Sequence, residues 1–265
     1  MKKANTVLVI VNTLTFLAML FANYASNVHI FADVNVAEVS KKYDTLFAPA
    51  NYAFLIWPVI YLLCFGFVIY EWVLLKNDPK QYIKRTGIWF TVSNLTNALW
   101  CYYWVHEWFG TCVLLILIQL FSLLVLVVHL RLELDDEPVR TIFFVWWPIA
   151  FYVGWMLTAT IACIAAWLVS IQWNGFGLSD DTWTIIMIIA ALLFYLLLHI
   201  KRNMRESSTV GVWALIAITV RQWDIHKNIA FTAIGAAVIL TIFISIHFYK
   251  GRNYIPFVKL KRGEW

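Results

Sequence analysis

An aromatic face near the start of the chain has the residue types that hold a flat molecule. Residues 47–63 read FAPANYAFLIWPVIYLL, an apolar stretch that begins at Pro49. Phe54, Trp57 and Tyr61 lie three and four residues apart, so their rings fall along one face of a helix. A helix that only had to cross a bilayer would not need this composition. The spacing therefore predicts a ring-lined face on one helix, and the rest of the chain has to indicate what that face is for.

A second face, on another helix, is rich in amides. The stretch WFTVSNLTNALWCYYWV places Asn94, Asn97 and Trp100 three residues apart, with Ser93 beside them. Amides in a bilayer are costly unless they face protein, water or ligand. One interpretation is hydrogen bonding between helices, and the other is a pocket for a flat, partly polar, mostly apolar ligand. The sequence leaves both open.

Tryptophan occurs fifteen times in the chain. An aromatic belt at the membrane interface explains those near the ends of apolar runs, such as Trp72 and Trp223. Trp57, Trp100 and Trp155 lie deeper, where an indole N–H needs a partner. These three indicate either packing between helices or the lining of a cavity.

The sequence carries few signs of catalytic or metal chemistry. It has no phosphate-binding glycine loop and no nucleophile elbow. No two histidines stand at a metal-ligand spacing, so we expect no metal site. The four cysteines, which lie within or at the edge of apolar runs, are expected to be buried free thiols. We therefore assign no catalytic residue, and an enzyme is the less favoured class.

The composition is that of an integral membrane protein. Of the 265 residues, 62% are hydrophobic and 13% are charged, against about 25% charged in a soluble domain. Apolar runs of about 20 residues predict helices rather than a barrel. The net charge of +5 does not indicate nucleic-acid binding, because the basic residues lie in short loops and the tail.

Eight helical spans are expected, including a retained first helix rather than a cleaved signal peptide. The ranges are 6–25, 52–75, 86–105, 109–130, 141–169, 182–200, 208–222 and 228–249. Pro148 predicts a kink in the fifth. Basic loops after the second and sixth spans and a five-base tail place both termini in the cytoplasm, in what we expect to be a bacterial inner membrane. The seventh span is short, with a re-entrant segment as the alternative.

Three pieces of sequence occur in a fixed order. They are a proline with a tryptophan eight and a tyrosine twelve residues later, an asparagine three residues before a tryptophan, and a later helix with a proline and a tryptophan. The residues are Pro49, Trp57, Tyr61, Asn97, Trp100, Pro148 and Trp155. In this order they resemble the tryptophan-rich sensory protein family (TspO/MBR, the translocator-protein family), over about residues 47–170.

The resemblance implies a fold and a ligand. It implies an all-α, five-helix membrane bundle, often a homodimer, whose cavity binds porphyrins and other flat apolar molecules. Here about three further transmembrane helices would follow, with residues 1–172 as the ligand-binding bundle and 173–265 as extra helices and tail. The sequence departs from the family at Asn51, where tryptophan is common, and at Cys163, where asparagine is expected.

The leading hypothesis is therefore a membrane sensor or translocator for planar apolar molecules such as tetrapyrroles. The alternatives are a membrane enzyme that degrades or rearranges such a ligand, and a partner-binding membrane subunit. The sequence indicates no definite cofactor, and a bound tetrapyrrole or lipid-like ligand is the candidate that the resemblance suggests. The proposed ligand-binding residues are Pro49, Phe54, Trp57, Tyr61, Asn94, Asn97, Trp100 and Trp155.

The connection over residues 26–51 is too long for a tight turn and too apolar for a disordered tether. We expect it to fold over the outer mouth of the cavity as a lid. Val36 and Val39 would then share one face of a short helix, and Phe47 would lead into Pro49. The alternative is an amphipathic segment that lies on the membrane surface.

Overall fold

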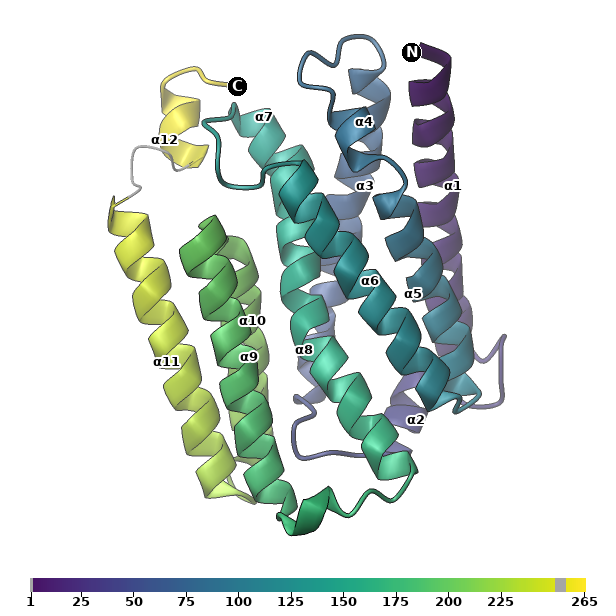
Figure 1. Ribbon diagram of the computed structural model, residues 1–265, viewed down its shortest axis with the longest axis vertical. Coiled ribbons are helices and arrows are strands. Elements are labelled where there is room, and N and C mark those ends of the chain that lie inside the picture. Colours follow the sequence, from purple (N-terminus) through teal and green to yellow (C-terminus); the bar gives the residue numbers. More distant parts are fainter. Residues whose placement is uncertain (1, 251–255) are drawn as a thin grey trace. The chain divides into compact units, whose positions relative to one another are not determined.

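The computed structural model describes residues 2–250 and 256–265 (Figure 1). These residues form helices joined by turns and loops, and no strand occurs among them. The predicted all-α class is therefore confirmed. Contacts divide the chain into two compact units that alternate along it: unit 1 comprises residues 1–45, 67–130 and 159–173, and unit 2 comprises 46–66, 131–158 and 174–265.

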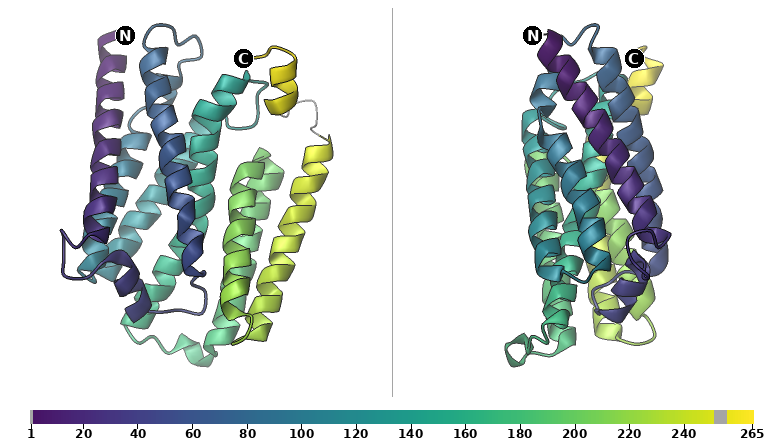
Figure 2. Two further views of the ribbon diagram at one scale, coloured as in Figure 1. Left: turned by 180° about the vertical axis from the view of Figure 1, so that it is seen from behind. Right: turned by 90° about the vertical axis from the view of Figure 1, so that its right-hand side faces the viewer.

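Unit 1 is built on three packed helices, with α5 against both α1 and α6 (Figures 1 and 2). It contains α1 (Lys2–Asn27), α2 (Val36–Lys42), α4 (Tyr82–Thr86), α5 (Trp89–Val105), α6 (Phe109–His129), and the second parts of α3 (Ile56–Leu74) and α8 (Trp147–Ser170). The short helix predicted from Val36 is confirmed as α2. It begins with a capping box in which Asn35 accepts from the Glu38 N–H and Glu38 accepts from the Asn35 N–H.

Unit 2 contains the first parts of α3 and α8 and a group of three packed helices, α9, α10 and α11. Its elements are η1 (Asn51–Leu55), α7 (Val139–Thr141), η2 (Ile142–Trp146), η3 (Gly175–Gly177), α9 (Asp180–Arg202), α10 (Arg205–Gln222), α11 (Lys227–Lys250) and α12 (Pro256–Lys261). Ser179 caps α9 by accepting from the Thr182 N–H.

A π-helical turn occurs where a proline kink was predicted. Residues 142–146 form η2, and the Trp147 N–H donates to the Ile142 carbonyl five residues earlier. Pro148 follows directly and has no N–H of its own, so the regular ladder of hydrogen bonds cannot pass through it. A π-helical turn is one of the known causes of a helix bend.

Six stretches of the described residues are long and apolar enough to cross a membrane: 3–27, 51–74, 109–129, 139–170, 180–202 and 227–250. The other two expected spans also form helices, but α5 has only 17 residues and α10 only 18. Their lengths are about 26 and 27 Å at 1.5 Å per residue. Three charged residues, Arg205, Glu206 and Arg221, lie within α10. That α5 and α10 cross fully stays a prediction.

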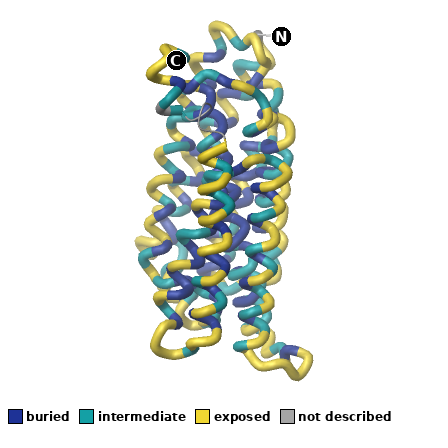
Figure 3. The backbone as a smooth tube through the Cα atoms, turned by 90° about the vertical axis from the view of Figure 1, so that its left-hand side faces the viewer, coloured by how far each residue is buried: buried dark blue, intermediate teal, exposed yellow. Residues whose placement is uncertain are grey.

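The helices expose apolar side chains along their length, as helices in lipid do. On α1 these include Val7, Leu14 and Phe21, and on α11 they include Phe231 and Val238. Figure 3 shows exposed and buried residues alternating along the helices. A surface of this kind is costly in water, so the side chains agree with the membrane class that the composition predicted.

Close packing joins α8, α9 and α10 in unit 2. A Cβ atom at Gly154 of α8 would lie 2.9 Å from the backbone of Ser207 in α10, and one at Gly211 of α10 would lie 2.8 Å from the Tyr195 ring in α9. The Tyr195 hydroxyl donates to the Gly154 carbonyl at 2.6 Å and pairs with Thr158 at 2.8 Å. Small residues at these crossings let the helices approach closely.

The expected division of the chain at residue 172, into a ligand-binding bundle and additional helices, stays a prediction. The four cysteines are buried and free, as predicted. Of the five basic residues of the tail, Arg252 lies outside the described residues. Lys259 of α12 is buried, and its Nζ contacts Asp136 and donates to the Glu137 carbonyl.

Candidate functional site

Four of the eight predicted site residues come together in unit 2 as a cluster of rings. Trp57 stacks on Tyr61 with ring centroids 5.3 Å apart, and its edge-to-face contact with Trp155 is at 6.4 Å. Phe54 meets Trp155 edge to face at 5.6 Å. These are the distances and orientations that aromatic pairs prefer. We call this group, with Tyr152, the aromatic cluster.

The local sequence explains how α3 presents its share of the cluster. Trp57 and Tyr61 are four residues apart and therefore lie one turn apart on the same face. Pro58 is the third residue of α3, where a backbone N–H has no partner within the helix in any case. Pro49 is buried just before η1, in which Phe54 lies.

Tyr152 was not predicted as a site residue. Its ring lies 5.9 Å from that of Trp57, edge to face, and the residue is fully buried. A signal for it was present, because Tyr152 and Trp155 are three residues apart in FYVGW and share one face of α8. The cluster thus consists of rings from two helices and one short 3₁₀ turn.

The other three predicted residues lie on α5 in unit 1. Asn97 accepts a hydrogen bond of 2.8 Å from the Asn23 amide of α1, which also donates to the Met19 carbonyl at 2.9 Å. This contact is of the interhelical kind considered from the sequence. Asn94 is fully buried, and its amide is 3.5 Å from Thr15 Oγ1 of α1.

Two polar atoms on this face of α5 lack a hydrogen-bond partner among the described residues. They are Asn94 Oδ1 and Ser93 Oγ, both fully buried. A buried polar atom without a partner costs about 1–3 kcal/mol. Such atoms are the ones a bound molecule with a polar edge would satisfy.

Trp100 stacks on Trp104 in α5 at 4.7 Å. Its indole N–H points to Cys163 Sγ at 3.5 Å, and the Trp104 N–H donates to the Val36 carbonyl at 3.2 Å. Cys163 stands where the resembled family has asparagine. In this chain, a thiol thus accepts the hydrogen bond of the deep indole.

The sequence reasoning missed a polar seam between α1, α3 and α5 of unit 1. The Asn12 amide donates to both carboxyl oxygens of Glu71, at 3.0 and 3.1 Å, and the Thr91 hydroxyl donates to Asn12 Oδ1 at 2.8 Å. Glu71 is 1% exposed. Because it lies near the end of a predicted span, the sequence did not mark it as a buried carboxyl group.

The connection that was expected to form a lid is attached to the turn between α5 and α6. Lys42 Nζ lies 2.7 and 2.9 Å from the Glu107 carboxylate, and the Tyr43 hydroxyl donates to it at 2.6 Å. The Lys42 hydrogen bond, then that of Tyr43, lowers the pKa of Glu107. Val39 of α2 is buried, so this segment is anchored to unit 1.

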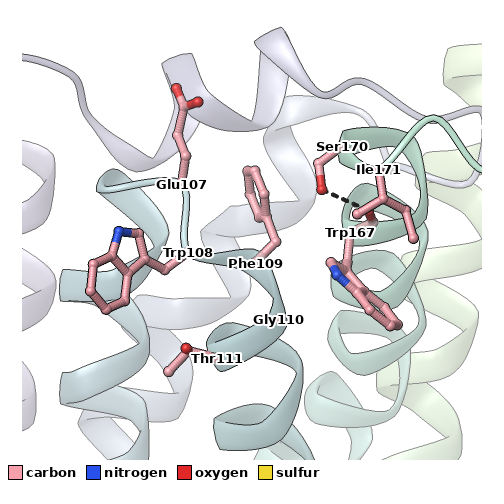
Figure 4. A pocket seen from close by; sticks show the side chains of 8 residues that line it. All are labelled: Glu107, Trp108, Phe109, Gly110, Thr111, Trp167, Ser170 and Ile171. Atoms are coloured by element: carbon pink, nitrogen blue, oxygen red, sulfur yellow. Dashed lines mark hydrogen bonds between the residues drawn. The ribbon is translucent and has the colours of Figure 1, made fainter.

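An open pocket of about 340 Å³ adjoins the same turn (Figure 4). It is lined by Glu107, Trp108, Phe109, Gly110, Thr111, Trp167, Ser170 and Ile171. None of the predicted site residues is among them. The indole groups of Trp108 and Trp167 lie on opposite sides of Gly110 in this view.

One comparison with known proteins gave a match. The model of a family described as TSPO-like protein matches residues 9–246. The match therefore includes α9, α10 and most of α11, which follow the region of resemblance. No curated protein and no solved structure matches the chain.

Proposed function

Since the chain belongs to the TSPO-like protein family and is an integral membrane protein, we propose that it binds a planar, largely apolar molecule of the tetrapyrrole class at the aromatic cluster. The family supports a ligand-binding or sensing membrane protein in general. The observation that carries the proposal is the set of ring contacts of Phe54 and Trp57 with Tyr152 and Trp155 of α8. Tyr61 stacks on Trp57 and completes the set.

The chemistry of the cluster favours a flat molecule. Edge-to-face and offset ring contacts hold partners through dispersion and the ring quadrupole rather than through directed hydrogen bonds. A flat aromatic ligand can therefore take the place of one ring neighbour without leaving a buried polar atom unpaired. Phe54 is 44% exposed and lies at the edge of the cluster, where a ligand would enter.

We propose separately that a second ligand-binding surface lies on α5 in unit 1. It would consist of Asn94, Asn97 and Trp100. The unpartnered Asn94 Oδ1 supports it, because a ligand with a polar edge would satisfy that atom. Asn97 supports it less, since its Oδ1 already accepts from Asn23. A ligand site of this kind would serve a transporter or a sensor, since both functions begin with ligand binding.

The proposal can be tested by titrating the purified protein in detergent with protoporphyrin and following tryptophan fluorescence and porphyrin absorption. We expect Trp57→Leu and Trp155→Leu each to weaken binding by about 1–3 kcal/mol, the size of a lost stacking surface. Trp223→Leu is the matched control, since Trp223 is half-exposed and lies outside the cluster. Equal affinity of all four proteins would contradict the proposal.

The same preparation separates the alternatives. Light-driven loss of the bound porphyrin would indicate an enzyme that degrades it. The absence of any porphyrin binding would favour the partner-binding subunit. We further propose that the protein is a homodimer in a bacterial inner membrane, which its mass in detergent would test. We also propose that both termini are cytoplasmic. A cysteine introduced in the tail should then not react with an impermeant reagent added outside intact cells.

A further inference from the structure

Residues 46–53, the docking segment, lie along α10 in unit 2. Four hydrogen bonds connect the segment to this helix: Gln222 Nε2 to the Leu46 carbonyl at 2.7 Å, Arg221 Nη1 to the Ala48 carbonyl at 2.9 Å, the Ala50 N–H to the Ala217 carbonyl at 3.1 Å, and Trp213 Nε1 to the Ala53 carbonyl at 3.0 Å. The Tyr52 ring also meets the Trp213 ring edge to face at 5.3 Å.

The order of these contacts shows that the segment runs antiparallel to α10. As the segment advances from Leu46 to Ala53, its partners on α10 fall from Gln222 to Trp213. Pro49 has no N–H, and a residue before proline favours extended backbone, so this part of the chain cannot satisfy itself as a helix. Three of its carbonyl groups accept from side chains of α10 instead.

The helix α10 is also fixed to α8, at the level of the rings. The Ser207 hydroxyl donates to the Ala150 carbonyl at 2.6 Å, and Gly154 packs directly on the Ser207 backbone. Ala150 and Gly154 flank Tyr152 and precede Trp155 in the sequence of α8. The helix α10 therefore contacts α8 beside Tyr152 and Trp155. It also holds the docking segment, which leads into Phe54 and Trp57.

We propose that α10 sets the geometry of the aromatic cluster, with Trp213, Arg221 and Gln222 as positioning residues for its ligand. This inference rests on the proposed function for the identity of the ligand. It gives a role to a helix beyond the region that resembles the five-helix family. The three side chains act through the docking segment and are not placed in contact with the ligand.

The test combines binding with a measurement of the contact itself. Trp213→Phe keeps the ring that faces Tyr52 but removes the indole donor, and Gln222→Met keeps the volume but removes the amide. For the double variant, we expect the dissociation constant for protoporphyrin to rise roughly tenfold, the scale of two lost buried hydrogen bonds, with unchanged helix content by circular dichroism. Trp223→Phe is the matched control and should bind as the parent does.

A cross-link distinguishes positioning from a general loss of stability. Cysteines introduced at Ala50 and Ala217, in a background in which the four native cysteines are alanine, would be joined by a short thiol reagent. We expect the cross-link to form readily in this background, to form in lower yield when the double substitution is added, and to restore porphyrin affinity once it has formed.

The outcomes separate the two proposals. Parent-like binding by the double variant, or a cross-link that leaves weakened binding unchanged, would overturn the positioning role. If the parent itself bound no protoporphyrin, the proposed ligand would be wrong. The positioning of the segment by α10 would then be judged on cross-linking alone. A yield that falls in the double variant supports it, and an unchanged yield overturns it.

Discussion

The aromatic cluster of unit 2 and the polar contacts between the helices of unit 1 both lie on apolar helices, but they are held in different ways. In the cluster, Trp57 and Trp155 contact other rings at 5.3 to 6.4 Å. In unit 1, Asn12 of the polar seam and the separate pair Asn23 and Asn97 form directed hydrogen bonds of 2.8 to 3.1 Å. A ring contact can be exchanged for a ligand contact more cheaply than an amide pair can be broken in hydrocarbon.

This difference indicates where a helical membrane protein can form a ligand site with little loss of free energy from broken contacts. Polar residues on a span can fix the mutual position of two helices, as α1 and α5 show. Stacked rings provide surface without fixing a hydrogen-bond geometry. We therefore propose the cluster as the main ligand site and expect the hydrogen bonds of Asn12, Asn23 and Asn97 to serve helix pairing.

The largest effect is expected from breaking the scaffold of unit 2. Gly154→Ala would place a Cβ atom 2.9 Å from the Ser207 backbone, which cannot move like the end of a side chain. We expect a loss of about 1–3 kcal/mol in stability, as for overpacked cores, together with weaker porphyrin binding. Thermal unfolding in detergent, followed by circular dichroism, measures the first.

Gly235→Ala provides the matched control for this substitution. Gly235 lies in α11, and a Cβ atom there would meet nothing within 4 Å. Alanine has the higher helix propensity, so we expect stability to rise by up to about 1 kcal/mol. If Gly154→Ala unfolded at or above the temperature of the parent, the close packing of α8 on α10 would not matter to the fold.

A smaller effect is expected from the pair of Asn23 and Asn97 between α1 and α5. Asn97→Leu removes the acceptor of the Asn23 amide and should lower stability by about 0.6–1.7 kcal/mol, the range of interhelical hydrogen bonds in membranes. We expect it to weaken protoporphyrin binding less than Trp57→Leu does. A greater loss of affinity for Asn97→Leu would move the ligand site toward unit 1 and break the comparison.

Much of this arrangement could be predicted from the sequence, because hydrophobic runs and helical spacing depend on local order alone. The eight helices, the short helix at Val36 and the shared face of Trp57 and Tyr61 are of this kind. The hydrogen-bond partners of side chains cannot be predicted from local order. That Asn97 would pair with Asn23, or that Gln222 would hold Leu46, depends on contacts between residues 74 and 176 positions apart.

The smallest effect concerns the attachment of α2, which depends on pH. Because the pKa of Glu107 is lowered in the folded protein, its contacts with Lys42 and Tyr43 are fully present above the ordinary glutamate pKa of about 4.3. They are lost as the pH falls through the lowered value. We expect residues 28–45 to resist proteolysis at neutral pH and to be cut faster under strongly acidic conditions.

Glu107→Gln tests that attachment at neutral pH. The amide keeps the size of the side chain but cannot form the charged contact with Lys42 Nζ. Faster cleavage of residues 28–45 in this variant, compared with Asp33→Asn as a control for charge at an exposed residue, would support the attachment. Slower cleavage of the parent with bound protoporphyrin would add the lid role that the sequence predicted, whereas an equal rate would remove it.

The binding of a porphyrin at the aromatic cluster can be tested by mapping where a porphyrin with a photoreactive group attaches to the protein in membranes. We expect light-dependent labelling of peptides that contain Phe54 to Tyr61 and Tyr152 to Trp155, suppressed by excess protoporphyrin and reduced in Trp57→Leu. Labelling confined to peptides of α1 and α5, or labelling that excess protoporphyrin does not suppress, would contradict a ligand site at the aromatic cluster.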